Sequence, residues 1–202
     1  MAYVKFHAPC TIILSGCTSS GKTSFVKRML NDLDVFSVKP CKVFYFYGAY
    51  QDCFSSMSNV TFISGLPDSF DEYFEPNEHR LAILDDLQYE VASSKAVESL
   101  FTRDSHHKNF SVCLLNQNLF YQGKFCRTIA LNAHVVVLFK NPRSNSQIKT
   151  LESQTGIKMI DAYNDTQQEP FGYLVVDIGP FSDSAYRLRS HIFSGEYPIV
   201  YK

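Results

Sequence analysis

The chain has 202 residues, of which 45% are hydrophobic and 14% aromatic, and its formal net charge is −1. This length and apolar content suffice for one sizeable core, so we expect a single domain over residues 1–202. Because the net charge is near zero, it gives no support for nucleic-acid binding. A nucleic-acid contact would need a local cluster of Lys and Arg. No apolar run approaches the roughly 20 residues of a membrane helix, so we do not expect a transmembrane role.

The cysteines favour a reducing compartment. The six of them form no CxxC pair, and the chain does not begin with the cationic segment and cleavage site of a signal peptide. We therefore expect reduced thiols in an intracellular protein that is not secreted.

Seven apolar runs of strand length recur along the chain, with helical segments or loops between them. They occupy residues 11–16, 42–48, 59–65, 81–87, 111–118, 134–141 and 172–179. Most are apolar at successive positions, as parallel strands covered on both faces require. Helices are expected after Gly21, over 94–101 and over 144–155, and polar loops over 67–80 and 164–172. This order predicts an α/β fold with a mainly parallel central sheet flanked by helices.

The segment GCTSSGKT, residues 16–23, matches the phosphate-binding pattern G-x-x-x-x-G-K-[ST] between a predicted strand and a predicted helix. Glycines allow the backbone to wrap phosphates, and the helix N-terminus supplies amide donors. Lys22 would reach the β and γ phosphates, and Thr23 would offer its hydroxyl to Mg²⁺. The expected nucleotide-binding residues are Gly16, Cys17, Thr18, Ser19, Ser20, Gly21, Lys22, Thr23 and Ser24.

Two adjacent carboxylates, Asp85 and Asp86, follow the buried run 81–84 in the manner of a Walker B motif. The carboxyl ends of strands are where α/β sheets place their sites. Asp85 would hold Mg²⁺, and Asp86 would orient or deprotonate an attacking water, which favours hydrolysis. The alternative for Asp86 is that it caps a turn.

A further buried run ends in three amides, Asn116, Gln117 and Asn118. Such amides can sense a γ-phosphate or position water, although they can equally form an Asx turn at a strand end. The chain lacks the Asn-Lys-x-Asp run that guanine specificity usually calls for, so we infer ATP as the nucleotide.

These motifs, in this order, resemble those of the FtsK/HerA superfamily of pumping ATPases. Residues 101–148, with 5–23 and 172–201, are similar to segments of the DNA-packaging ATPases of polinton-like and adintovirus-like elements, which are related to the poxvirus packaging ATPase. The resemblance covers most of the chain. It implies an additional-strand, RecA-like P-loop ATPase that forms a ring, with a hexamer favoured. Such a ring drives double-stranded DNA into a preformed capsid in the infected host cell.

The resemblance also implies roles for particular residues. Lys22 and Thr23 are the P-loop pair, Asp85 is the Mg²⁺ ligand, Asp86 is the catalytic acid where many relatives carry Glu, and Gln117 is the sensor amide. In the P-loop, Cys17 and Ser19 replace the more usual Pro and Gly, and we expect these replacements to stiffen the loop.

A ring ATPase needs an arginine finger on the neighbour's γ-phosphate. Arg103 is favoured, because relatives place the finger in its region, while Arg127 and Arg143 remain alternatives and each could simply be a surface arginine. For DNA contact the chain offers Lys124 and Arg127 beside aromatic residues, although ordinary loops have the same composition.

Three further expectations complete the sequence-based picture. His106 and His107 have no ligand-spaced partners, so we expect loop histidines near an interface and no metal site there. A monomeric P-loop nucleotide kinase is the main alternative function, although no lid arginines are evident. A regulator that binds ATP and hardly hydrolyses it is the third.

Overall fold

The computed structural model describes residues 4–143 and 145–202, and its centre is a nine-stranded sheet. The strand order is β3-β2-β4-β5-β1-β6-β7-β8-β9. Strands β1 to β6 pair in parallel, whereas β7, β8 and β9 are antiparallel to their neighbours. The predicted mainly parallel sheet is therefore confirmed. The strands are β1 Thr11–Ser15, β2 Lys42–Tyr47, β3 Val60–Ser64, β4 Arg80–Asp85, β5 Phe110–Asn116, β6 Val135–Phe139, β7 Tyr173–Asp177, β8 Leu188–Ser190 and β9 Ile199–Tyr201.

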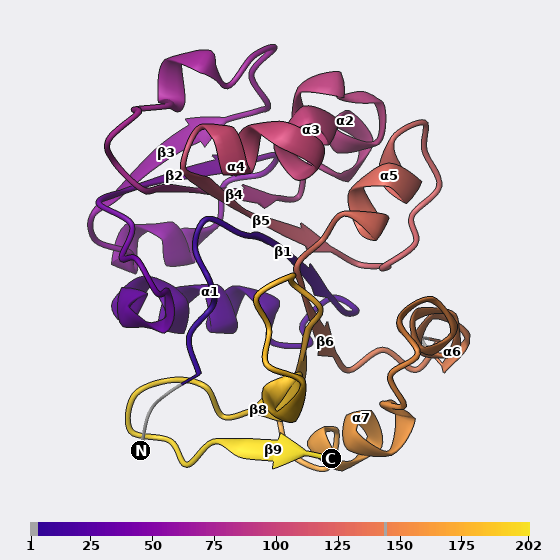
Figure 1. Cartoon of the computed structure of the whole chain (residues 1–202). Coiled ribbons are helices and arrows are strands. Elements are labelled where there is room, and N and C mark those ends of the chain that lie inside the picture. Colours follow the sequence, from indigo (N-terminus) through magenta and orange to yellow (C-terminus); the bar gives the residue numbers. More distant parts are fainter. Residues whose placement is uncertain (1–3, 144) are drawn as a thin grey trace.

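Helices cover both faces of this sheet, with α1 on the opposite side from α2, α3 and α5 (Figure 1). Figure 1 labels seven α-helices among the described residues. They are α1 Lys22–Asn31, α2 Gln88–Ser93, α3 Lys95–Ser99, α4 Ser105–His107, α5 Cys126–Leu131, α6 Asn145–Thr155 and α7 Ile160–Thr166. A π-helical turn, η4, spans Leu100–Asp104 and joins α3 to α4.

The continuous apolar character of the strands follows from this double cover. In β1, Ile12 and Leu14 face the core under α1, while Ile13 belongs to the core under the other helices. Successive strand residues point to opposite faces, so a strand between two helical layers is apolar at every position. All seven residues of β5 are buried for this reason.

All seven predicted strands are present, but several short elements lie outside the sequence prediction. These are α2, α4, α5, α7, β8 and β9. Helix α7 ends at Thr166, inside the segment expected to be a loop, and His106 and His107 lie on α4 and not in a loop. The helix expected over 144–155 is α6, Asn145–Thr155, and Ser144 lies outside the described residues. Among the described helices, none has the length and apolar character needed to cross a membrane.

The parallel strands β1, β4, β5 and β6 all end at one edge of the sheet, which we call the carboxyl edge. The P-loop follows β1 at this edge, and Asp86 and Gln117 follow β4 and β5. The additional strand β5 lies between β1 and β4. The fold thus brings the predicted motifs to one place.

Candidate active site

The P-loop is held between the strands on either side of β1. The Gly16 amide donates to the Asn116 carbonyl at 3.2 Å, and the Cys17 amide donates to the Lys140 carbonyl at 3.2 Å. A Cβ at Gly16 would lie 2.5 Å from the Phe139 Cβ and 2.6 Å from the Ser20 Oγ, so no side chain fits there. The first glycine of the motif is therefore required by packing as well as by phosphate access.

Ser19 takes a left-handed conformation in this loop, with φ of 60°. Left-handed backbone costs a serine more than it costs a glycine. The replacement of the usual Gly therefore leaves local strain in the P-loop. Ser20, the next residue, has a buried Oγ without a hydrogen-bond partner among the described residues, and such an atom calls for a ligand or water.

Lys22 begins α1 and folds back over the loop. Its Nζ donates to the Gly16 carbonyl at 2.5 Å and to the Cys17 carbonyl at 2.9 Å. Burial lowers the pKa of Lys22, and the nearby Asp85 carboxylate partly opposes this effect. The ammonium is thus partly desolvated and pre-positioned, and phosphate oxygens could replace the two carbonyls.

Asp85 is the last residue of β4 and is 7% exposed. Its Oδ2 accepts from the Tyr45 hydroxyl at 2.7 Å and from Gln51 Nε2 at 3.3 Å. Burial raises the pKa of Asp85, while the hydrogen bond from Tyr45 acts in the opposite direction. The Asp85 carboxylate and the Thr23 hydroxyl, with phosphate oxygens added, would make the all-oxygen donor set that suits Mg²⁺.

The structure separates the two aspartates. Asp86 lies just beyond β4, is exposed, and has a left-handed φ of 55°. The neighbouring chain approaches closely, because a Cβ at Gly48 would lie only 2.0 Å from the Asp86 carbonyl oxygen. One carboxylate is therefore fixed in the interior, and the other faces solvent at the carboxyl edge.

The three amides after β5 also differ in environment. Asn116 is buried, and its Oδ1 has no partner among the described residues. Gln117, the predicted sensor, has an exposed side chain, and its carbonyl accepts from Asn141 Nδ2 at 3.3 Å. Asn118 accepts from Gln147 at 3.4 Å. Asn116 is thus a second sensor candidate.

The three arginines considered as fingers are exposed and lie at two different edges. Arg103 is in η4, in the last part of the crossover that returns to the start of β5, and it contacts Asp104 and Ser99 at 3.1 Å each. That position is toward the opposite edge of the sheet, where β5 begins and which we call the amino edge, and it is away from the chain's own P-loop. Arg127 and Arg143 follow β5 and β6 and lie toward the carboxyl edge.

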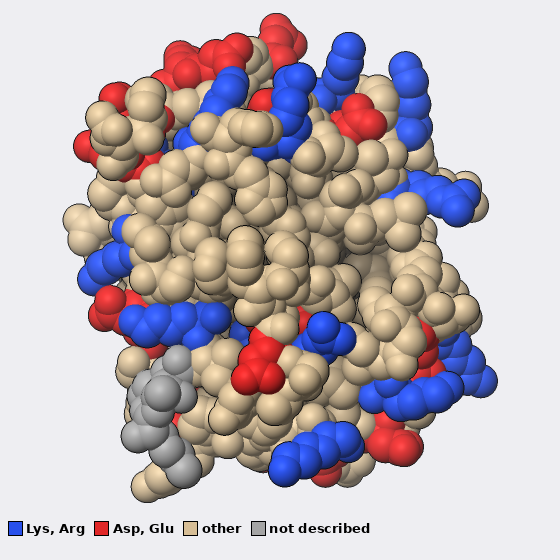
Figure 2. Space-filling view, in the orientation of Figure 1, with Lys and Arg blue, Asp and Glu red and all other residues tan. Residues whose placement is uncertain are grey.

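The loop after β5 carries the proposed DNA contacts, Lys124 and Arg127, both exposed. The rings of Tyr121 in this loop and Tyr89 in α2 meet edge to face at 6.3 Å, so the loop lies beside the segment that follows Asp85 and Asp86. Figure 2 shows acidic and basic side chains interspersed around the rim of one face and few charges at its centre. That face carries no extended basic patch.

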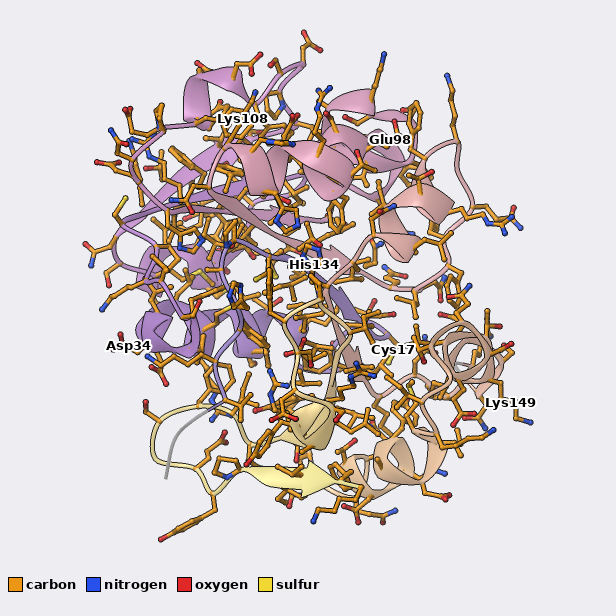
Figure 3. The ribbon with its side chains drawn as sticks, viewed as in Figure 1. Cys17, Asp34, Glu98, Lys108, His134 and Lys149 are labelled. Carbon is orange, nitrogen blue, oxygen red and sulfur yellow. The ribbon has the colours of Figure 1, made fainter. Side chains whose placement is uncertain are left out.

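His106 belongs to a histidine pair. Its Nε2 lies 3.2 Å from the Nε2 of His134, which precedes β6. Among residues 4–143 and 145–202, no group of three His, Cys, Asp or Glu side chains is arranged to hold a metal ion. Figure 3 labels His134 and Cys17, which lie beyond opposite ends of β1 and β6.

Sequence reasoning missed two residues of this site, Tyr45 and Gln51. Tyr45 appears in the sequence as one more aromatic strand residue, and Gln51 lies in a loop. Only the pairing of β2 with β4 brings them to Asp85.

No protein-family model matches the chain, and no curated protein matches its sequence. Among solved structures, the genome packaging NTPase B204 of Sulfolobus turreted icosahedral virus 2, in complex with ATP-gammaS, has a TM-score of 0.59 at 12% identity over 96% of each chain. B204 of Sulfolobus turreted icosahedral virus, described as a DNA-packaging ATPase, has a TM-score of 0.59 at 11% identity over 96% of this chain and 97% of that chain. The AMP complex of the former has a TM-score of 0.55 at 12% identity, covering 84% and 92%. Identities this low establish the fold alone, and that fold is the predicted α/β P-loop NTPase fold.

Proposed function

We propose that this chain hydrolyses ATP and uses the energy to move double-stranded viral DNA into a preformed capsid. The observation that carries the hydrolysis part is the P-loop itself, in which the half-buried Lys22 ammonium is held over the loop by the Gly16 and Cys17 carbonyls, with the buried Asp85 carboxylate nearby. A cation for the phosphates and an anion for their metal are the two charges that phosphoryl transfer requires.

The proposed chemistry assigns one task to each group. Lys22 and the loop amides bind the β and γ phosphates, and Thr23 and Asp85 would hold Mg²⁺, which would supply charge neutralisation on the transferred group. Asp86, at the exposed end of β4, orients the attacking water and accepts its proton. The side chain of Asn116 or Gln117 senses whether the γ-phosphate is present.

The packaging part rests on the resemblance of the sequence and on the fold shared with the two B204 proteins, a genome packaging NTPase and a DNA-packaging ATPase. It includes a homo-oligomeric ring, with a hexamer favoured, in which Arg103 acts on the neighbour's ATP. Lys124 and Arg127 contact the DNA, and capsid components are further partners, in the infected cell.

The test is phosphate release from Mg²⁺-ATP by the purified protein, measured with and without duplex DNA. We expect turnover that duplex DNA stimulates, and Lys22→Ala should abolish it in both conditions. Normal turnover by Lys22→Ala would contradict the P-loop assignment.

The same assay separates the alternatives. A nucleotide kinase would transfer the phosphate to a nucleoside monophosphate and release little of it into water. A regulator would bind ATP without measurable turnover, with or without DNA.

A further inference from the structure

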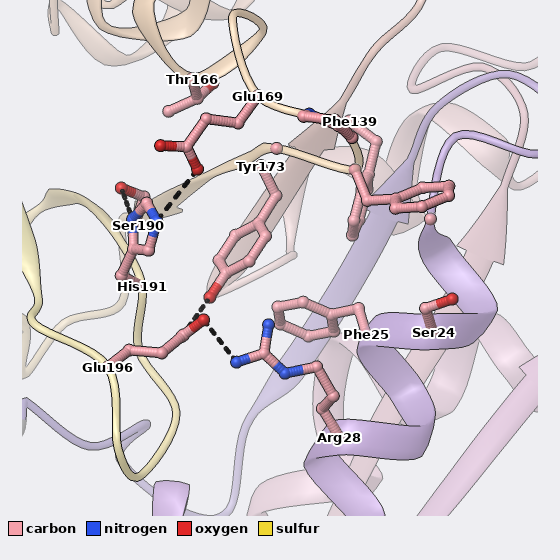
Figure 4. Close-up of a pocket in the computed structure, with 14 residues that line it drawn as sticks. Ser24, Phe25, Arg28, Phe139, Thr166, Glu169, Tyr173, Ser190, His191 and Glu196 are labelled. Atoms are coloured by element: carbon pink, nitrogen blue, oxygen red, sulfur yellow. Dashed lines mark hydrogen bonds and ion pairs between the residues drawn. The ribbon is translucent and has the colours of Figure 1, made fainter.

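A cavity of about 250 Å³ opens beside the first turns of α1, next to the last glycine of the P-loop. Figure 4 shows it bounded by α1 on one side and by the chain around β7 and β8 on the other. Its lining includes Gly21, Ser24, Arg28, Phe171, Tyr173 and His191. Pockets for drug-sized ligands are typically about 300–1,000 Å³, so this one suits part of a nucleotide.

The strand order determines which part that is. Asp85 and Asn116 end β4 and β5, which lie on one side of β1, and the γ-phosphate must face them. The other end of a triphosphate held at the N-terminus of α1 must then leave toward β6 and β7, on the other side of β1. The cavity lies on that side, since Phe139 of β6 and Tyr173 of β7 line it.

The cavity offers an aromatic surface at its entrance. Phe171 is 62% exposed and has a left-handed φ of 59°, although it is a large apolar residue. Its Cβ lies only 3.0 Å from where a Cβ of Gly21 would be, so it stands directly against the P-loop. An exposed aromatic side chain in a strained backbone, beside a phosphate loop, is suited to stacking on a base.

Beneath this entrance the cavity has an aromatic floor and a polar rim. Phe25 packs edge to face on Tyr173 at 4.9 Å between ring centroids. His191 Nε2 lies 3.2 Å from Glu169, and Arg28 contacts Glu196 at 2.5 Å, as the dashed lines in Figure 4 mark. Carboxylates on the rim can accept hydrogen bonds from ribose hydroxyls or from an exocyclic amine.

We propose that this cavity receives the adenosine half of ATP, with the base stacked on Phe171. This inference rests on the proposed function, because it presumes that the P-loop holds the triphosphate. It predicts that affinity for the nucleoside and affinity for the phosphates can be changed separately.

The experiment compares the binding of ATP and of inorganic tripolyphosphate, both with Mg²⁺, by calorimetric titration. In the wild type, ATP should bind more tightly than tripolyphosphate. Phe171→Ala should weaken ATP binding about 5- to 150-fold, the range that corresponds to the loss of one base-aromatic stack, and should leave tripolyphosphate binding unchanged. Phe171→Tyr keeps the ring and should retain most of the ATP affinity.

The matched control is Phe181→Ala, which removes another exposed phenylalanine, 69% exposed and lining a separate cavity with His134. It should change neither affinity. An equal loss of both affinities in Phe171→Ala would mean that Phe171 supports the P-loop and does not hold the base, and unchanged ATP binding would place the base elsewhere. If the wild type bound neither compound, the proposed function itself would be wrong.

Discussion

The carboxylate of Asp85 is oriented by residues that are not themselves predicted ligands. The Tyr45 ring is fully buried, and its hydroxyl reaches across from β2 to donate to Asp85 at 2.7 Å. Burial raises the pKa of Tyr45, and the charge of Asp85 and the hydrogen bond to it raise the pKa further. The phenol therefore stays protonated and remains a donor. Groups that orient metal ligands in this way commonly affect metal affinity 10- to 100-fold.

Tyr45→Phe tests this role, because it keeps the ring and removes only the hydroxyl. We expect the Mg²⁺ concentration for half-maximal ATP turnover to rise about tenfold, with a smaller fall in the maximal rate. Turnover measured across a Mg²⁺ titration checks this. The control is Tyr47→Phe on the same strand, which should behave as the wild type. If the Mg²⁺ dependence is unchanged in Tyr45→Phe, the hydroxyl contributes only to packing and does not orient the Asp85 carboxylate for Mg²⁺.

The different environments of Asp85 and Asp86 predict different losses. Asp86→Asn should bind ATP normally and hydrolyse it at least about 100-fold more slowly, because the amide cannot accept a proton. Asp85→Asn should weaken Mg²⁺-dependent ATP binding as well. Binding and single-turnover hydrolysis measured on both variants distinguish these effects. If only Asp85→Asn blocks turnover while Asp86→Asn is silent, the two roles are wrongly assigned.

At the scale of elements, a histidine pair ties the helical crossover to the sheet. His134 Nδ1 accepts from the Thr11 amide at 3.1 Å, so its Nε2 carries the proton and donates to His106 Nε2. Burial lowers the pKa of His134 to about 4, and the charges of His106 and His7 add to this, while Asp177 opposes it. The pair therefore requires a neutral His134.

This requirement predicts a pH dependence of stability. The pKa of His134 in the unfolded chain is about 6.5, so the unfolded state binds the additional proton between pH 6.5 and about 4. The free energy of unfolding should therefore fall as the pH is lowered through this window. Denaturant unfolding at several pH values measures it. In His134→Asn, whose Oδ1 can accept from Thr11, the fall should be smaller, and an equal fall would assign the effect to other groups.

The sequence predicted the long elements and missed the short ones for a physical reason. Strands β5 and β6 have seven and five consecutive buried residues, most of them apolar, and helix α6 spans three turns, so the patterns are readable. Strand β8 has three residues and α7 has seven, and tertiary pairing decides them.

The residues of the candidate site also fall into those that the sequence predicted and those that it missed. The P-loop and the acidic pair are contiguous in sequence, and local pattern sufficed to find them. Tyr45 and Phe171 reach the site from distant segments, and no local pattern distinguishes them from core or surface aromatic residues. The assignments of Gln117 as sensor and of Arg103 as finger stay predictions.

At the scale of the whole molecule, Arg103 and the P-loop lie at opposite edges of the sheet. An arginine at the amino edge cannot reach the γ-phosphate of its own chain. If Arg103 is a finger, it must serve a second copy whose carboxyl edge faces it. The hypothesis that Arg103 is the finger therefore requires that copies of this chain assemble with one another.

Mixing two inactive variants tests that coupling. Arg103→Ala should bind ATP normally and hydrolyse it about 10³- to 10⁵-fold more slowly, and Lys22→Ala should be inactive with an intact finger. Co-assembled, the two should recover part of the activity, because some interfaces then combine an intact P-loop with an intact arginine. ATP turnover across mixing ratios measures the rescue.

The absence of rescue at every ratio, with mixed oligomers verified by native mass measurement, would point to Arg127 or Arg143. The matched control is Arg127→Ala mixed with Lys22→Ala. If Arg103 is the finger, Arg127→Ala should retain hydrolysis when assayed alone.

The close approach of Gly48 to Asp86 restricts which sequences can encode this protein. Any side chain at position 48 would collide with the Asp86 carbonyl oxygen, whose contact distance to a Cβ would be 2.0 Å. The main chain that carries the acidic pair would have to move, although no charge and no residue of either motif had changed. A substitution of Gly48 by alanine, just after β2, is therefore excluded by the position of the acidic pair, so the candidate site depends on a residue in a segment that carries neither of its acids.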